Sequence, residues 1–300
     1  MTHHSVGRWR RGEAPGNPGA ARDIAGALAV LWAVSERPAP RGPARPGLIA
    51  GIGANALGVA QEVGGIVLLT AEVVRALVPP RIDSRELWKN LYKMGNRSVP
   101  IVVLTALFAG GLMTVQAGPF VKKFGATGLA GWAAGYAVLR EMGPILIALM
   151  FSGRVGANNT AELSTMTVTE QLDGLRALAI DPIPYLITPR VVGMMIALFC
   201  LTLIGDAVAI FGGALFGKLL LGVELSSFLH SFADNLKPWD LEIGLVKAAV
   251  FGLAISITSC HFGVTVKGGA VGVGRAVNDA VVAAAVAIMI SDHLLTMVMR

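Results

Sequence analysis

The chain has 300 residues, of which 54% are hydrophobic and only 15% are charged, and its mean hydropathy is +0.65. Soluble domains carry about 25% charged residues, so the composition argues against an ordinary soluble domain and favours a protein whose surface lies in lipid. The formal net charge is +6. Because the basic residues gather in an N-terminal tail and in short loops, we interpret them as determinants of membrane orientation and expect no nucleic-acid partner.

Residues 1–47 are rich in Arg, Pro and Gly and are predicted to form a solvated, largely disordered tail. An apolar stretch within it, Ile24 to Val34, follows basic residues and imitates a signal peptide. No clean A-x-A cleavage site follows, so a surface helix or a start codon assigned too early is the preferred interpretation. Residues 48–300 are predicted to form one membrane domain.

The stretch from Leu48 to Val78 is apolar but interrupted by polar side chains. They are Gln61, Glu62, Glu72 and Arg75. Its longest charge-free piece, Leu48 to Ala60, has 13 residues, whereas a membrane-spanning helix needs about 20. We therefore predict an interfacial helix over residues 48–78, lying along the bilayer, with a sixth membrane span as the alternative.

Five later stretches are long enough, or nearly so, to cross a hydrocarbon core of about 30 Å. They are Val99 to Phe120, Trp132 to Phe151, Val191 to Gly217, Gly244 to Gly263 and Ala280 to Val298. With the N-terminus in the cytoplasm, ten Lys and Arg fall inside and five outside, the bias expected for that orientation. The sequence thus predicts an all-α integral membrane protein with about five transmembrane helices.

Ionisable side chains fall inside these predicted spans. They are Arg140, Glu141, Asp206, Lys247 and Asp292. Such residues are costly in a membrane and are usually paired or functional. Adjacent residues of a helix do not face each other, so Arg140 and Glu141 each need a partner elsewhere, for which the other three are candidates. Two interpretations stay open: a buried ion-pair network that holds the bundle, and a gate or polar wall beside a transport route.

The segment between the second and third predicted spans is expected to hold a short cytoplasmic helix. Thr167 and Glu170 have capping-box spacing, which predicts a helix start, and the Asp181-Pro182 pair predicts its end. Apolar residues at helical spacing follow the cap: Val168, Leu172, Leu175 and Ala179. The remaining faces carry Glu170, Gln171, Asp173 and Arg176.

This amphipathic helix has two interpretations, a surface helix on the membrane or a coupling helix that docks on a cytosolic partner. Its acidic face favours the coupling helix, because anionic headgroups attract Lys- and Arg-rich helices. At the adjoining cytoplasmic ends of the spans, Arg154 with Glu162 is a candidate pair that fixes the loop, and Arg275 is expected to snorkel toward headgroups.

Two blocks of the chain resemble the MlaE/YrbE permease family. The first reads REMGPILIALMFSGRVGANNTAELSTMTVTEQLDGLRALAIDPIPYLITPR, and the second reads GVGRAVNDAVVAAAVAIMISDHLLT. The resemblance covers about Val99 to the C-terminus in order and spacing. Asn158-Asn159 replaces the family's usual small residues and Ser164 a usual Gly, which puts the local packing in doubt.

The resemblance implies a homodimeric permease of the bacterial inner membrane. Each subunit would pair with a separate cytosolic ATPase that holds ATP and Mg, and an MCE-domain protein would sit on the periplasmic side. The complex would move phospholipid or a related lipid between the inner membrane and the outer envelope. Residues 99–120 are expected to line the lipid cavity in part, with Leu112 and Gln116 as lining residues.

The candidate site residues combine the residue patterns above with the resemblance. The ATPase-coupling helix is assigned Thr167, Glu170, Gln171, Asp173, Leu175, Arg176, Asp181 and Pro182, and the structure of the cytoplasmic loops is assigned Arg154, Gly156, Glu162, Arg190, Gly274 and Arg275. Arg140, Glu141, Asp206 and Asp292 are the intramembrane polar or gating residues.

No enzymatic activity is expected from this chain. The run from Gly212 to Lys218 nearly spells a phosphate-binding loop, but Leu219 replaces the required Ser or Thr and the run is intramembrane. No catalytic constellation, cofactor or metal site is expected, and His261 and His293 stand singly. Two alternatives remain: an ion-coupled secondary carrier that uses Arg140, Glu141 and Asp292, and a membrane scaffold that recruits a cytosolic partner.

Overall fold

The computed structural model describes residues 48–77, 84–123, 125 and 130–299. The predicted tail, residues 1–47, lies outside this range, so that prediction stays a prediction. The chain divides into a first unit, Met1–Val59, of which the start of helix α2 is described, and a second unit, Ala60–Arg300. Within the described residues all regular structure is helical, which confirms the all-α class.

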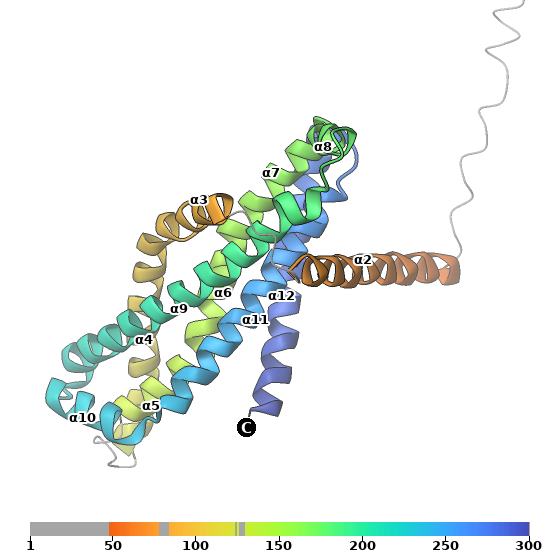
Figure 1. Ribbon diagram of the computed structural model, residues 1–300. Helices are drawn as coiled ribbons and strands as arrows, with labels where there is room; N and C mark the ends of the chain where they lie inside the picture. The colour runs from red at the N-terminus through yellow and green to blue at the C-terminus, as the bar shows by residue number, and fades with distance from the viewer. Residues whose placement is uncertain (1–47, 78–83, 124, 126–129, 300) are drawn as a thin grey trace, which may run out of the picture. The chain divides into compact units, whose positions relative to one another are not determined.

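The helices follow one another along the chain with short connections (Figure 1). The α-helices are α2 Leu48–Leu77, α3 Ser84–Met94, α4 Val99–Lys123, α5 Ala130–Ala137, α6 Gly143–Phe151, α7 Ala157–Val168, α8 Gln171–Ala177, α9 Thr188–Phe216, α10 Leu225–Asn235, α11 Pro238–Val264 and α12 Gly269–Val298. A 3-10 turn, η1 Asn96–Ser98, joins α3 to α4, and four π-helical turns join or extend others: η3 Val138–Met142, η4 Ser152–Gly156, η5 Ile183–Ile187 and η6 Gly217–Leu221.

Six helical segments of the described chain are long and apolar enough to cross a membrane. Five of them match the five predicted spans, the first ending one residue before Phe120. They are 85–119, 131–168, 183–221, 238–264 and 269–298. The sixth is Ala56–Leu77 within α2, the stretch for which the sequence favours an interfacial helix over a span.

The α2 residues that belong to the second unit contact the rest of that unit at one level only. Glu62 and Gly65 both meet His261, near the C-terminal end of α11. Leu69 and Val73 then join a buried cluster whose other members lie at that same end. They include Leu163, Leu172, Leu186, Val191 and Cys260. A helix that spanned beside α11 would contact it along its length, so this pattern favours a helix that lies across the end of the bundle.

Two of the membrane helices run farther than hydropathy predicts. The segment 131–168 continues through η3 and η4 into α7, and the segment 183–221 includes η5, α9 and η6. The expected loop that begins after Phe151 is therefore wrong as far as Val168, because the Gly- and Ser-containing run at η4 passes through a π-turn without ending the helix. Only residues 169–182 remain as the connection that carries α8.

The bundle is held by a buried core and by close backbone contacts. Val102, Ile147, Phe151, Leu198 and Phe251 belong to one core cluster. At the α4–α9 crossing, a Cβ added to Gly110 would lie 1.8 Å from the carbonyl oxygen of Ala209, and one added to Gly212 would lie 2.2 Å from that of Leu107. Glycine is required there because only a bare backbone lets the two helices approach so closely.

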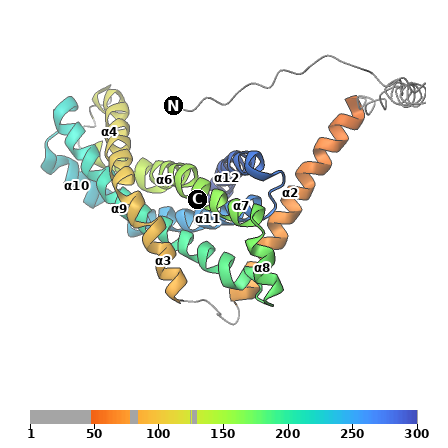
Figure 2. The same cartoon turned by 90° about the horizontal axis from the view of Figure 1, so that it is seen from above.

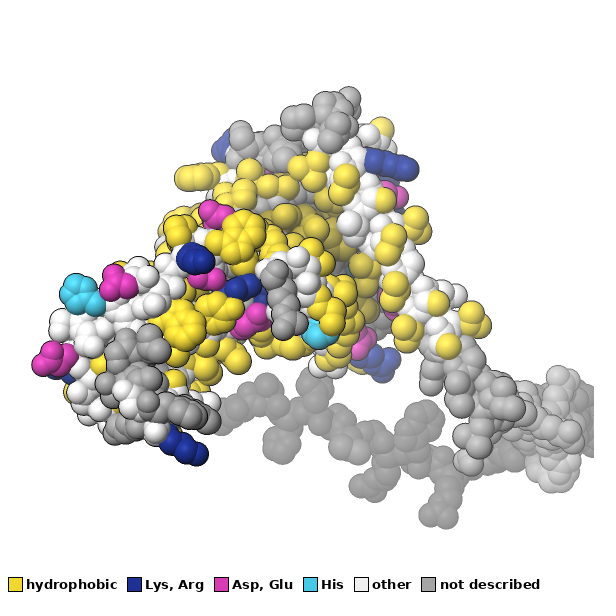
Figure 3. Space-filling model, turned by 90° about the horizontal axis from the view of Figure 1, so that it is seen from below, with side chains coloured by type: hydrophobic (Ala, Val, Ile, Leu, Met, Phe, Trp, Pro, Cys, Tyr) yellow, Lys and Arg dark blue, Asp and Glu magenta, His cyan; other side chains and the backbone are white. Residues whose placement is uncertain are grey.

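Large hydrophobic side chains also cover much of the outer surface. They are exposed on several helices, among them Leu104, Phe108 and Leu112 on α4, Phe199, Leu203 and Phe211 on α9, and Val286, Ile290 and Leu294 on α12. In Figure 3 they form broad hydrophobic areas in which charged groups stand apart. Patches of this extent are rare on soluble monomers and suit contact with lipid or with another membrane chain.

Candidate functional site

Helix α8 begins differently from the expected capping box. Thr167 lies in the last turn of α7, where its hydroxyl is 2.8 Å from the carbonyl oxygen of Leu163 and 3.1 Å from that of Gly263. Glu170 is the N-cap residue, in the left-handed region at φ 59°, and makes no side-chain capping bond. The capping-box prediction is therefore wrong, because Thr167 lies inside α7 and Glu170 takes the N-cap position of α8.

The polar face of α8 is exposed and its apolar face is only partly covered. Leu172 is buried and Leu175 half-buried, packed beside Leu69 and Val73 of α2. The side chains of Glu170, Gln171, Asp173 and Arg176 are exposed, and Arg176 pairs with Asp173 at 3.0 Å. Figure 2 shows α8 at the edge of the bundle, next to α2.

The predicted limits of the apolar face are wrong at both ends. Val168 belongs to α7 and is exposed, and Ala179 lies beyond α8 at φ 60° and is exposed as well. Leu178 is 73% exposed. The Asp181 carboxylate accepts a hydrogen bond from the backbone N–H of Ile183 at 3.0 Å. The Asp181-Pro182 pair therefore starts the next helix, whereas α8 has already ended at Ala177.

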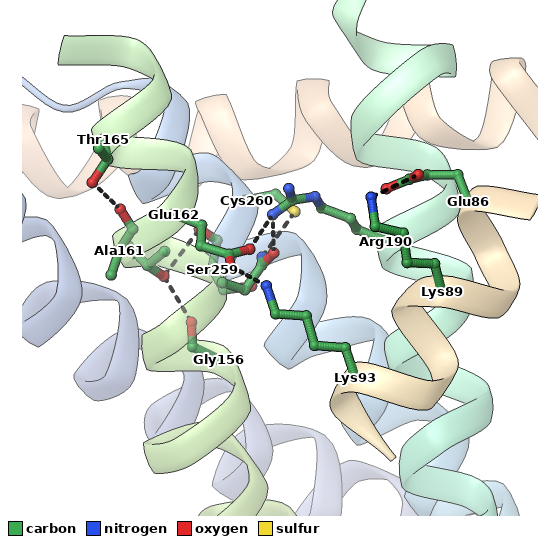
Figure 4. Close-up of polar contacts among 12 residues, drawn as sticks. Glu86, Lys89, Lys93, Gly156, Ala161, Glu162, Thr165, Arg190, Ser259 and Cys260 are labelled. Atoms are coloured by element: carbon green, nitrogen blue, oxygen red, sulfur yellow. Dashed lines mark hydrogen bonds and ion pairs between the residues drawn. The ribbon is translucent and has the colours of Figure 1, made fainter. Parts of the chain in front are cut away.

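Beneath α8, charged side chains from three helices meet in one cluster (Figure 4). Glu162 of α7 pairs with Lys93 of α3 through one carboxylate oxygen and with Arg190 of α9 through the other, the latter at 3.3 Å. Arg190 also donates to Asn159 Oδ1 at 3.0 Å, and Asn159 donates to Ser259 Oγ at 2.9 Å. The cluster ties α3, α7, α9 and α11 together at the α8 end.

The partner expected for Glu162 is wrong. Arg154 is exposed in η4 and has no ion pair within the described residues, since Lys93 and Arg190 take both oxygens of Glu162. Lys93 is not among the predicted site residues, because it lies before the first predicted span. Asn159, predicted only as a departure from the family pattern, supplies the amide oxygen to which Arg190 donates.

The remaining residues assigned to the cytoplasmic loops do not join this cluster. Gly156 is buried, and a Cβ there would lie 3.1 Å from Ile255 Cγ2, so it serves the packing of η4 on α11. Gly274 and Arg275 are exposed on α12, and a Cβ added to Gly274 would meet nothing within 4 Å.

A second charged network lies inside the membrane segments, around Lys247 of α11. Its ammonium group is fully buried and lies 2.7 Å from Glu141 Oε2 and 2.9 Å from Asp292 Oδ1. It also donates to the carbonyl oxygen of Arg140 at 2.9 Å and to the hydroxyl of Thr296 at 2.8 Å. Two of the three predicted partners, Lys247 and Asp292, thus take part in one network.

Arg140 and Glu141 both lie in the π-turn η3 and, as adjacent residues of a helix, point in different directions and reach different partners. Arg140 pairs with Asp240 at 3.5 Å and donates to the Tyr136 hydroxyl at 2.8 Å. Asp206, the third predicted partner, is not part of the network. Its buried carboxylate lies against Gly143 and makes no hydrogen bond within the described residues.

Comparison with known proteins decides the family. A family model described as Permease MlaE matches residues 87–298. The chain belongs to the MlaE permease family. It is 39% identical over 245 residues, 82% of this chain and 95% of the relative, to a protein named probable ABC transporter permease protein in Rickettsia felis.

Two further relatives of this MlaE-family chain come from photosynthetic organisms. A probable ABC transporter permease protein of Synechocystis is 37% identical over 77% of this chain and 88% of its own length. The Arabidopsis thaliana protein named TRIGALACTOSYLDIACYLGLYCEROL 1, chloroplastic, is 38% identical over 76% of this chain and 65% of its own length. The match to the family model runs from α3 to the end of α12, so both charged clusters lie within it.

The MlaE-family residues expected to line a lipid cavity lie on an open face. Leu112 is 54% exposed and Gln116 is exposed one turn later, in line with Leu104 and Phe108 on α4. Within the described residues no group of three or more His, Cys, Asp or Glu could hold a metal ion. His261 lies 2.8 Å from Glu62, and His293 is exposed.

Proposed function

We propose that this MlaE-family chain is the transmembrane subunit of an ABC transporter that moves phospholipid or a related lipid between the bacterial inner membrane and the outer envelope. The observation that carries the proposal is α8, a short helix with exposed acidic side chains at the end of two long membrane helices. A permease needs such an element to receive force from a separate ATPase. The chain itself has only a degenerate phosphate loop, with Leu219 in the Ser/Thr position.

The coupling step follows from what α8 touches. Leu172 and Leu175 pack on α2, α7 and the start of α9, so a push on α8 acts on the ends of both long helices. ATP-driven closure of a cytosolic ATPase supplies the push, and the differing contacts of the ATPase in its two states bias the permease between two arrangements. ATP and Mg are held in the ATPase, not in this chain.

The lipid part of the proposal rests on the apolar outer faces. The face of α4 that carries Leu112 and Gln116 is open, and a second copy of the chain would turn it into a cavity for acyl chains. The name of the Arabidopsis relative refers to a galactolipid, in keeping with a lipid as the transported molecule. A homodimer with an MCE-domain protein on its periplasmic side completes the proposed complex.

The test is a mild-detergent pull-down of the tagged chain from its native membranes, with mass spectrometry of the recovered proteins. Wild type is compared with Glu170→Arg, which reverses an exposed charge on the polar face of α8. The matched control is Asp234→Arg, which reverses an exposed charge on α10. We expect an ATPase with wild type and Asp234→Arg and a loss of at least about tenfold with Glu170→Arg, as reversal of an interface charge commonly costs several kcal/mol.

Recovery of the ATPase in equal amounts with all three proteins would reject α8 as the contact. Recovery with none of them, while the chain remains folded, would reject the ABC permease. Loss with both variants would show a charge effect that is not specific to α8.

A second candidate function, an ion-coupled secondary carrier, is favoured by one observation, the buried Asp206 carboxylate without a hydrogen-bond partner in the described chain. Charged groups inside a membrane often belong to proton pathways. Lipid transport by reconstituted protein that follows a pH gradient and ignores ATP would select this carrier over the ABC permease.

A further inference from the structure

A hollow of about 500 Å³ opens between α3, α7 and α9 at the α8 end. Its charged lining consists of Lys89 and Lys93 from α3, Arg190 from α9, and two carboxylates, Glu86 and Glu162. Cationic groups outnumber carboxylates by one, and Lys89 pairs with Glu86 at 3.5 Å. Figure 4 shows the Lys93 and Arg190 side chains extending from α3 and α9 toward Glu162 on α7.

Two buried hydrogen-bond donors in the wall of the hollow lack acceptors within the described residues. Asn90 is 5% exposed and Arg190 7% exposed, and neither Asn90 Nδ2 nor Arg190 Nε has a hydrogen-bond partner within the described residues. Both side chains line the hollow. Glu162 cannot satisfy these donors, because its two oxygens already pair with Lys93 and Arg190 Nη1. Buried donors without acceptors are costly, so the site calls for a ligand with several acceptor oxygens.

The position of the hollow points to the membrane interface. Helix α3 exposes Trp88 and Tyr92, 74% and 66% exposed, beside Lys89 and Lys93 in sequence. Trp and Tyr gather where the hydrocarbon core meets the headgroups, and Lys near that surface attracts anionic lipid. Trp88 and Tyr92 lie on one face of α3, and Lys89 and Lys93 lie on the adjacent face. This combination places the hollow at the depth of the lipid headgroups.

We infer that this hollow binds the phosphate headgroup of an anionic phospholipid from the leaflet at the α8 end. Lys89 and Lys93 attract the phosphate, while Asn90 and Arg190 donate hydrogen bonds to its oxygens. Glu162 lowers the affinity by occupying Lys93 and Arg190, so its charge opposes binding. The inference rests on the proposed function for the lipid nature of the ligand, but it does not depend on the ATPase.

The experiment measures binding of phosphatidylglycerol to the purified full-length chain in detergent, by native mass spectrometry or thermal shift. Phosphatidylcholine and inorganic phosphate are titrated in parallel. The Lys89→Gln/Lys93→Gln pair is expected to lower the apparent affinity for phosphatidylglycerol about thirtyfold, because each Lys near a membrane surface contributes roughly 1 kcal/mol. Glu162→Gln is expected to raise it about threefold or more, by freeing Lys93 and Arg190.

The matched control is Arg154→Gln/Lys267→Gln, which removes the same charge from exposed positions outside the hollow. We expect it to change the affinity by less than about twofold. An equal fall in the control would overturn the site in favour of general surface charge. A fall with Glu162→Gln would assign Glu162 a structural role and overturn the inference as well.

Titration with inorganic phosphate distinguishes the two ligands that could supply a phosphate group, a lipid headgroup and a free phosphate ion. Weak competition by phosphate, with a clear preference for phosphatidylglycerol over phosphatidylcholine, supports a lipid headgroup. Stabilisation by phosphate alone, with no response to phosphatidylglycerol, overturns the lipid and leaves a soluble anion. The binding experiment contains no ATPase, so its result does not depend on the result of the α8 pull-down. A negative result in one experiment therefore does not decide the other.

Discussion

Individual charged residues in this chain are stabilised by specific partners, not by solvent. Lys247 is fully buried yet lies within 3 Å of oxygens from two carboxylates, as shown by its distances of 2.7 Å to Glu141 and 2.9 Å to Asp292. These contacts form the buried ion-pair network that was one of the two interpretations of the intramembrane charges. A gating role for the same residues stays a prediction, since pairing in one state does not exclude exchange of partners in another.

The first residue-scale prediction concerns Lys247→Met. The substitution keeps the approximate length of the side chain but leaves Glu141 and Asp292 without their shared cation, which in a buried pair costs about 3–5 kcal/mol. We expect a clearly lower melting temperature in detergent. The triple variant Lys247→Met/Glu141→Gln/Asp292→Asn should recover much of the loss, because no uncompensated charge remains. A Lys247→Met protein as stable as wild type would contradict the network.

The helices show which parts of the site can be predicted from sequence patterns. Helix α8 was predicted in the right place because Leu172 and Leu175 carry a helical period that depends only on local sequence. Its start was wrong because Thr167 bonds to the carbonyl oxygen of Leu163, and also approaches that of Gly263 in α11, a contact set by tertiary structure. The Lys93–Glu162–Arg190 cluster joins positions 69 and 28 residues apart in the chain, so no local pattern signals it.

Close packing of α4 on α9 predicts that two glycines at their crossing cannot be replaced without loss of stability. At the α4–α9 crossing, Gly110→Ala would place a methyl group on the carbonyl of Ala209. Gly212→Ala would do the same to the carbonyl of Leu107. Neither backbone can yield without separating the helices, so each substitution should destabilise the protein by at least the roughly 1–3 kcal/mol of ordinary overpacking. Thermal unfolding in detergent measures the effect.

The control for this prediction is Gly274→Ala on α12, where an added Cβ meets nothing within 4 Å. It should leave stability unchanged or raise it by up to about 1 kcal/mol, because Ala has the higher helix propensity. The sequence also contains two pairs of glycines spaced four residues apart, Gly131 with Gly135 and Gly213 with Gly217. Gly131 and Gly213 both pack against Phe228 of α10 within one chain, so these contacts serve the fold of the single chain.

At the scale of the whole molecule, the fold class and family follow from the sequence because apolar windows and the long motif blocks are local features. The extents of the helices do not. The segment 183–221 has 39 residues, about 58 Å at 1.5 Å per residue, against a hydrocarbon core of about 30 Å. Hydropathy detects the part of a helix that faces lipid. The backbone hydrogen bonds of the helix continue beyond that part into water.

The membrane-spanning segment 183–221 stands between α8 and α10, because α8 precedes it and α10 follows it in the chain. The two helices must therefore lie on opposite sides of the membrane. With the predicted orientation, α8 is cytoplasmic and α10 periplasmic. A membrane-impermeant maleimide should label Asp234→Cys in intact spheroplasts, and should label Asp173→Cys only after the membrane is permeabilised. The wild-type chain, with Cys260 buried and Cys200 on the apolar face of α9, supplies the background.

A third cysteine decides how many helices cross the membrane. If α2 lies in the interface, five spans separate the N-terminus from the C-terminus, and Ser5→Cys should be labelled only after permeabilisation, like Asp173→Cys. If α2 spans, Ser5→Cys should be labelled in intact spheroplasts, like Asp234→Cys. We expect the first result, because Glu62, Gly65, Leu69 and Val73 all contact one end of the bundle. Labelling of Asp173→Cys from outside would instead invert the whole orientation and remove α8 from the reach of a cytosolic ATPase.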